Sequence, residues 1–114
     1  MPISYYNIKG SVAVENELLA PESGRVTSIS IANVGSSYKV RLSLYLQDTV
    51  RSQENQSAAS TIYLYRNLYI PIGVTLILDE PEFLTYNTKV YGLYARIESP
   101  SQTSQEADII VRTE

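Results

Sequence analysis

Residues 37–48 read Ser-Tyr-Lys-Val-Arg-Leu-Ser-Leu-Tyr-Leu-Gln-Asp, a stretch in which apolar and polar side chains alternate. The apolar positions are Tyr38, Val40, Leu42, Leu44 and Leu46. On a β-strand, successive side chains point to opposite faces, so this stretch has one apolar face and one polar face. A helix would need apolar residues at i, i+3 and i+4, and that spacing is absent here. A strand with a long apolar face requires a second layer that covers it.

The rest of the chain contains further segments of this extended kind. Strands are expected at residues 5–9, 11–16, 25–33, 61–67, 74–78, 89–98 and 107–112. Residues 18–24 are expected to form a connection, because Pro21 fixes φ and Gly24 tolerates positive φ. The turn-forming residues 33–36 predict that residues 25–48 form one long antiparallel hairpin.

Regularly spaced strands without a helix of any length predict an all-β fold. We expect an antiparallel β-sandwich, jelly-roll or immunoglobulin-like, with about seven or eight strands. The 114 residues are the size of one domain, so residues 1–114 form a single sandwich, with residues 1–10 as an N-terminal arm. In the last strand Ile109 and Val111 face one way, and the charged end Arg112-Thr113-Glu114 should discourage edge pairing.

The composition excludes several classes of function. The chain has no cysteine and no histidine, so disulfides, thiolate metal sites, imidazole ligands and Ser-His-Asp triads are excluded. The net charge is −3 and the basic residues are scattered, which argues against nucleic-acid binding. No apolar run reaches the ~20 residues that span a bilayer, so no membrane partner is expected. No cofactor is expected either. The N-terminus lacks a secretory signal pattern, which fits an intracellular product or a particle assembled in a host cytoplasm.

The densest acidic cluster comprises Asp79, Glu80 and Glu82, which flank Pro81. Two of these carboxylates could serve glycoside hydrolysis, or the cluster could bind Ca²⁺. The alternating Asp/Asn and Gly pattern of a calcium loop is absent, which favours a solvated turn. Serine and threonine are plentiful, but no histidine could activate them. The sequence therefore predicts a protein that is not an enzyme.

Tyrosine is the unusual feature of the composition, with ten tyrosines against one phenylalanine and no tryptophan. Tyr45, Tyr63, Tyr65 and Tyr69 cluster in and beside two expected strands. In the second of these, Tyr63 and Tyr65 are expected on the same side, opposite Ile62 and Leu64. Such rings suit a protein interface, stacking against sugars, or cross-strand packing within the chain, and the sequence leaves all three open.

Two stretches are turns that lead into strands, and a third is the strand that follows them. They are Leu-Ala-Pro-Glu-Ser-Gly-Arg-Val-Thr-Ser-Ile-Ser-Ile-Ala-Asn at 19–33, Ile-Pro-Ile-Gly-Val-Thr-Leu-Ile-Leu at 70–78, and Val-Tyr-Gly-Leu-Tyr-Ala at 90–95. Together they resemble small accessory structural proteins of tailed-phage virions, over most of residues 18–98.

The resemblance implies a non-enzymatic virion structural protein. The expected role is a capsid decoration or cement protein that stabilises the shell in many copies; a neck or tail component is the alternative. Its partners would be major capsid or neck/tail proteins and copies of itself. A carbohydrate-binding module for host recognition is the competing hypothesis. The residues expected at the interface are Tyr5, Tyr6, Ile8, Tyr45, Tyr63, Tyr65 and Tyr69.

Overall fold

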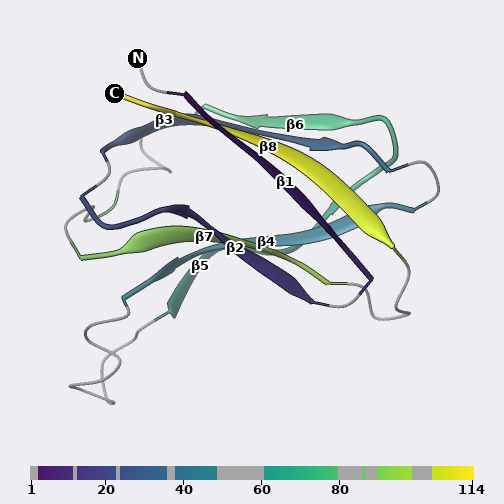
Figure 1. Cartoon of the computed structure of the whole chain (residues 1–114), viewed down its shortest axis with the longest axis horizontal. Coiled ribbons are helices and arrows are strands. Elements are labelled where there is room, and N and C mark those ends of the chain that lie inside the picture. Colours follow the sequence, from purple (N-terminus) through teal and green to yellow (C-terminus); the bar gives the residue numbers. More distant parts are fainter. Residues whose placement is uncertain are drawn as a thin grey trace.

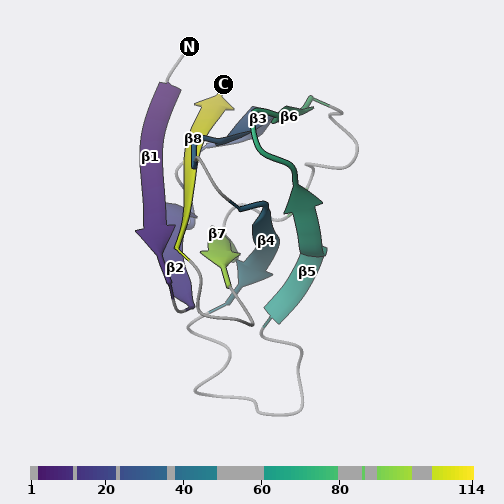
Figure 2. The ribbon, with the colours of Figure 1, turned by 90° about the vertical axis from the view of Figure 1, so that its right-hand side faces the viewer.

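A computed structural model describes residues 3–11, 13–22, 24–35, 38–48, 61–79, 86, 90–98 and 104–114. These residues form eight β-strands and no helix. The strands are β1 (Ile3–Gly10), β2 (Val14–Leu19), β3 (Val26–Asn33), β4 (Val40–Gln47), β5 (Thr61–Ile70), β6 (Thr75–Leu78), β7 (Gly92–Ile97) and β8 (Gln105–Thr113). Figures 1 and 2 show two sheets that face each other, with the start of β1 and the end of β8 near one end of the molecule.

The sheet order defines a jelly roll. One sheet has the order β1-β8-β3-β6 and the other β2-β7-β4-β5, and all pairs are antiparallel. β1 pairs with β8, β2 with β7, β3 with β6 and β4 with β5, as if one long hairpin had been rolled into two layers. This order differs from the immunoglobulin arrangement. The expected antiparallel sandwich is therefore confirmed, and the topology selects the jelly roll.

The core lies between the two sheets, on the faces that the alternating pattern predicted. In β4, Val40, Leu42, Leu44 and Leu46 are all buried, as expected. These four residues belong to one hydrophobic core with side chains from β7 and from the sheet β1-β8-β3-β6. The other members include Ile29, Ile31, Leu93, Ala95, Ile97, Ala107, Ile109 and Val111. Tyr38 is the exception, because it precedes β4 and is exposed.

The expected hairpin over residues 25–48 is wrong, because β3 and β4 lie in different sheets. The side chain of buried Asn33 links the end of β3 to the start of the other sheet. Its Nδ2 donates to the carbonyl oxygens of Tyr38 at 3.0 Å and Ile70 at 2.9 Å, while its Oδ1 accepts from the backbone of Gly35 at 3.0 Å. These bonds satisfy backbone groups at the corner where the chain crosses to the other layer.

The last strand, β8, lies inside its sheet between β1 and β3, and its alternating Ala107, Ile109 and Val111 are fully buried. The expectation that residues 18–24 form a connection is wrong at its start, because Leu18 and Leu19 end β2 and are buried. The segment expected as an N-terminal arm forms β1 in its described part, and β1 pairs with β8 along its whole length.

Irregular pairing between β4 and β5 changes which tyrosines face outward. Leu44 pairs with Tyr65 and the next residue, Tyr45, pairs with Tyr63, so β5 contains an extra residue at this point. Directly paired residues lie on the same face of a sheet. Tyr65 therefore shares the inner face with Leu44, and Tyr63 shares the outer face with Tyr45. The expectation that Tyr63 and Tyr65 lie on one side is wrong.

We predict that Leu44→Ala lowers the free energy of unfolding by about 2–5 kcal/mol, because it opens a cavity in a closed core. Leu44 has no exposed surface. Urea unfolding followed by circular dichroism measures the loss. Ile77→Ala, at an exposed position, is the control and should change the free energy by no more than about 0.5 kcal/mol. Equal losses in the two variants would contradict the assignment of the inner face.

Candidate interaction surfaces

A row of tyrosines crosses the outer face of the sheet β2-β7-β4-β5. Tyr45 in β4 pairs with Tyr94 in β7 and with Tyr63 in β5. Its ring lies 5.6 Å from that of Tyr94, nearly parallel at 12°, and 5.5 Å from that of Tyr63, tilted at 51°. Because the neighbours cover it, Tyr45 is only 4% exposed. Cross-strand packing within the chain therefore accounts for Tyr45, and it leaves Tyr63 at 43% exposure beside it.

Two glutamates of β2 flank the row on one side. The Tyr94 hydroxyl donates to Glu17 Oε2 at 2.7 Å, and the Tyr45 hydroxyl donates to Glu15. Burial, together with the hydrogen bond and negative charge of Glu17 and the charge of Glu15, raises the pKa of Tyr94 to about 12. The hydroxyl of Tyr94 thus remains a donor at neutral pH.

Arginines dominate the other side of the same face. A hollow of about 70 Å³ lies among Arg41, Ser43, Tyr63, Arg66, Asn67, Arg96 and Glu98. Glu98 bridges Arg96 at 2.9 Å and Arg41 at 3.3 Å. The guanidinium of Arg66 lies 5.2 Å from the centre of the Tyr63 ring, a cation–π contact.

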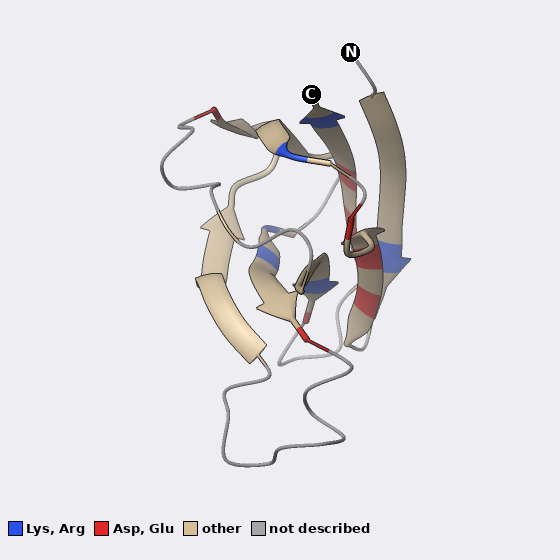
Figure 3. Cartoon of the chain, turned by 90° about the vertical axis from the view of Figure 1, so that its left-hand side faces the viewer, with Lys and Arg blue, Asp and Glu red and all other residues tan. Residues whose placement is uncertain are grey.

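We call this outer face the divided face, because its edge strand β2 carries two glutamates and the other three strands carry arginines, two of which are bridged by Glu98. Glu15 and Glu17 lie on the edge strand β2, and Figure 3 colours the acidic residues of the chain red and its lysines and arginines blue. Arg96, Arg41 and Arg66 lie on β7, β4 and β5. The tyrosine row runs across the sheet from the acidic side toward the basic side.

The outer face of the sheet β1-β8-β3-β6 has a different character. Tyr5 pairs with Ile110, Ile110 with Ser30, and Ser30 with Ile77, so these four side chains form a row across all four strands. We call it the apolar row. Tyr5 is 71% exposed and Ile77 is 62% exposed. Beside Tyr5 and Ile110 lies a largely apolar hollow of about 350 Å³. Large apolar side chains that are exposed together mark binding surfaces.

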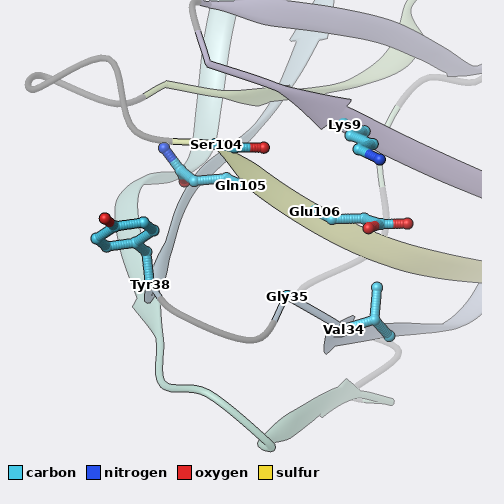
Figure 4. A pocket seen from close by; sticks show the side chains of 7 residues that line it. All are labelled: Lys9, Val34, Gly35, Tyr38, Ser104, Gln105 and Glu106. Atoms are coloured by element: carbon cyan, nitrogen blue, oxygen red, sulfur yellow. The ribbon is translucent and has the colours of Figure 1, made fainter.

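A third feature is a pocket of about 270 Å³ near the turn that follows β3. It is lined by Lys9, Val34, Gly35, Tyr38, Ser104, Gln105 and Glu106. Figure 4 shows Tyr38 and Gln105 on one side of the pocket and Lys9 and Glu106 on the other. Gln105 is buried, and its Oε1 accepts from the backbone N–H of Arg41 at 2.8 Å. The pocket therefore combines an aromatic ring with fixed polar groups.

Of the seven residues expected at an interface, some are exposed at the surface and the others are buried or covered. Tyr5, Tyr63 and Tyr69 are exposed, so they are available to a partner. Tyr5 lies on one outer face, and Tyr63 and Tyr69 lie on the other, so the structure does not bring all three together.

The remaining four face the interior or are covered. Ile8 is only 1% exposed and belongs to the core, so its expected place at an interface is wrong. The Tyr6 hydroxyl donates to the carbonyl of Leu18, which ties β1 to β2 across the sandwich. Tyr65 packs against the core, and Tyr45 is covered by its neighbours.

Tyr94 is a member of the row that the sequence reasoning missed. It lies between Leu93 and Ala95, both of which are fully buried. Alternation along β7 therefore places it on the outer face, and this signal was present in the sequence.

The acidic cluster expected around Pro81 is described only in part. Asp79 is exposed just after β6, whereas Glu80 and Glu82 lie outside the described residues. Within the described ranges, no three acidic side chains are placed to hold a metal ion. The same ranges contain no helix long and apolar enough to cross a bilayer.

No protein-family model and no curated protein sequence matches the chain. Among solved structures, it is similar to the crystal structure of the Yersinia pseudotuberculosis-derived mitogen. The alignment covers 99% of this chain and 86% of that one, with a TM-score of 0.51 and 14% sequence identity. The likeness is one of fold. It supports the two-sheet β architecture and carries no conclusion about what this chain binds.

We predict that Tyr94→Phe reduces the loss of stability at alkaline pH. The pKa of Tyr94 is raised from 10.0 to about 12 in the folded chain, so the unfolded chain loses this proton first. The contribution is therefore complete below pH 10 and is lost as the pH rises to about 12. Urea unfolding at about pH 8 and about pH 11 measures the difference. Tyr69→Phe is the control. If Tyr94→Phe loses as much unfolding free energy between the two pH values as the wild-type chain does, the assignment is contradicted.

Proposed function

We propose that this chain is a non-enzymatic structural protein of a tailed-phage virion, which decorates the capsid shell in many copies. The observation that carries the proposal is the apolar row Tyr5, Ile110, Ser30 and Ile77. This row would contact the shell protein. A neck or tail site is the alternative location, and it would use the same contact chemistry.

The apolar row has the form of a contact surface. Ser30, a small side chain, separates Ile110 from Ile77, and the ends of the row carry the exposed Tyr5 and Ile77. Such a face can receive a partner's side chains between two apolar anchors. Burial of these anchors contributes about 25 cal/mol per Å² of apolar surface. Tyrosine is enriched at protein interfaces because its ring is large and its hydroxyl tolerates water.

A contact surface of modest size can stabilise a shell when many copies of the chain bind to it. A subunit that binds only the assembled shell stabilises that state by mass action, and the symmetry of the shell repeats the contact. Two further observations support the proposal. The jelly roll is an architecture found in viral capsid domains. Three stretches within residues 18–98 resemble accessory virion proteins. The location that follows is the virion, assembled in the host cytoplasm.

The pocket beside Tyr38 favours a second candidate function, carbohydrate binding. Sugar sites combine an aromatic platform with polar groups of fixed orientation, and jelly rolls also occur among lectin domains. Tyr38, Gln105 and Glu106 supply these groups around one pocket. A glycan array in which the chain gives signals that Tyr38→Ala abolishes would favour this function; an array without signal would remove it.

We predict that the double variant Tyr5→Ser/Ile77→Ser loses binding to phage heads stripped of their decoration protein. The variant removes both exposed anchors of the apolar row, and its affinity should fall about tenfold or more. Co-sedimentation of purified chain with stripped heads measures it. Tyr69→Ser, an exposed tyrosine on the opposite face, is the matched control and should bind as the wild-type chain does.

Two results would refute the proposed function. One is that wild-type chain does not bind stripped heads under conditions in which it is folded. The other is that the double variant and the Tyr69→Ser control bind equally, which would show that the apolar row is not the contact.

A further inference from the structure

We propose that the divided face binds a second copy of this chain, as a two-fold symmetric dimer in which the tyrosine rows face each other. The proposal concerns the sheet β2-β7-β4-β5, and the proposed shell contact uses the other sheet. The dimer can therefore be confirmed or refuted whether or not the shell contact exists. What points to a second copy is that the acidic side and the basic side of this face are complementary to each other.

The register of the sheet gives the geometry. Glu17, Tyr94, Tyr45 and Tyr63 are successive partners on β2, β7, β4 and β5, so they form one row across the whole sheet. A two-fold axis that runs parallel to the strands, above the boundary between β7 and β4, places β2 of one copy over β5 of the other. It leaves positions along the strands unchanged. Each row therefore meets its own reversed copy.

Opposite charges then meet at both ends of the row. Glu17 of one copy comes to lie over Tyr63 of the other, where the Arg66 guanidinium is held above the ring. Glu17 uses Oε2 to accept from Tyr94, which leaves its second oxygen for a partner. Among the described residues, no carboxylate forms an ion pair with Arg66. Two equivalent Glu17–Arg66 pairs follow, and each joins a carboxylate to a guanidinium fork.

The aromatic surface of this contact comes from Tyr94 and Tyr63. Tyr94 of one copy lies over β4 of the other, and exposed Tyr63 lies at each end of the aromatic part, whereas Tyr45 is covered by these neighbours and supports their rings from below. Tyrosine and arginine are the residues that most often carry binding energy near the middle of protein interfaces. The chain as a whole has a net charge of −3, so two copies repel each other at long range. A face that brings opposite charges together offsets this repulsion. It also favours one orientation of the two copies.

Charge exchange tests the pairing directly. Glu17→Arg and Arg66→Glu each place like charges together at both ends of the row in a dimer of that variant. Each should raise the dimer dissociation constant about tenfold or more, measured by sedimentation velocity at low salt.

An equimolar mixture of the two variants provides the rescue. At one end of the mixed dimer, the substituted position 17 of one copy meets the substituted position 66 of the other. At the other end, the unchanged Glu17 and Arg66 form the original pair. Because both ends then join opposite charges, the mixture should regain dimers of near wild-type affinity.

Controls separate this result from misfolding and from the shell contact. Circular dichroism and urea unfolding establish that each variant is folded, and Glu17→Lys replaces Glu17→Arg if the latter is not. The Tyr5→Ser/Ile77→Ser variant should dimerise as the wild-type chain does, because its changes lie on the other sheet. About 0.5 M salt should weaken the wild-type dimer, because it screens the end pairs. A wild-type chain that stays monomeric, or folded variants whose mixture does not regain dimers, would overturn the proposal.

Discussion

The burial of two apolar sheet faces against each other is the constraint on which the rest of this structure depends. Leu44 at the centre of β4 and Ile109 at the centre of β8 have no exposed surface, and both point between the layers. Because side chains alternate along a strand, filling the interior also fixes which residues point outward. The two outer faces are therefore consequences of the core. They are the surfaces that the fold leaves for contact with other molecules.

The two outer faces differ in chemistry, although the same alternation produces both. One carries an apolar row that ends in exposed Tyr5 and Ile77. The other carries an aromatic row between the acidic edge at Glu17 and the basic side at Arg66. A face of the first kind fits an apolar partner surface, whereas a face of the second kind fits a partner of matching charge. If both proposals hold, one small domain binds a shell protein and a second copy of itself through different faces.

Local alternation made the strands and the core of β4, β7 and β8 predictable from the sequence. Sheet order was not predictable, because it depends on bonds between residues far apart in the chain, such as Asn33 to the carbonyl of Ile70. The candidate site was predicted only in part for the same reason. The extra residue in β5 turns Tyr65 inward beside Leu44 while Tyr63 stays outward, and no local pattern indicates it. The burial of Ile8 was not predictable either, because it depends on the pairing of β1 with β8 at the other end of the chain.

A density map of the native particle tests the central claim most directly, namely that the core determines two outer faces and that both are used for binding. The account predicts that Tyr5 and Ile77 are covered by the shell protein and that Glu17 of one copy lies against Arg66 of the next. A map in which this chain is present and either outer face is bare to solvent would contradict it.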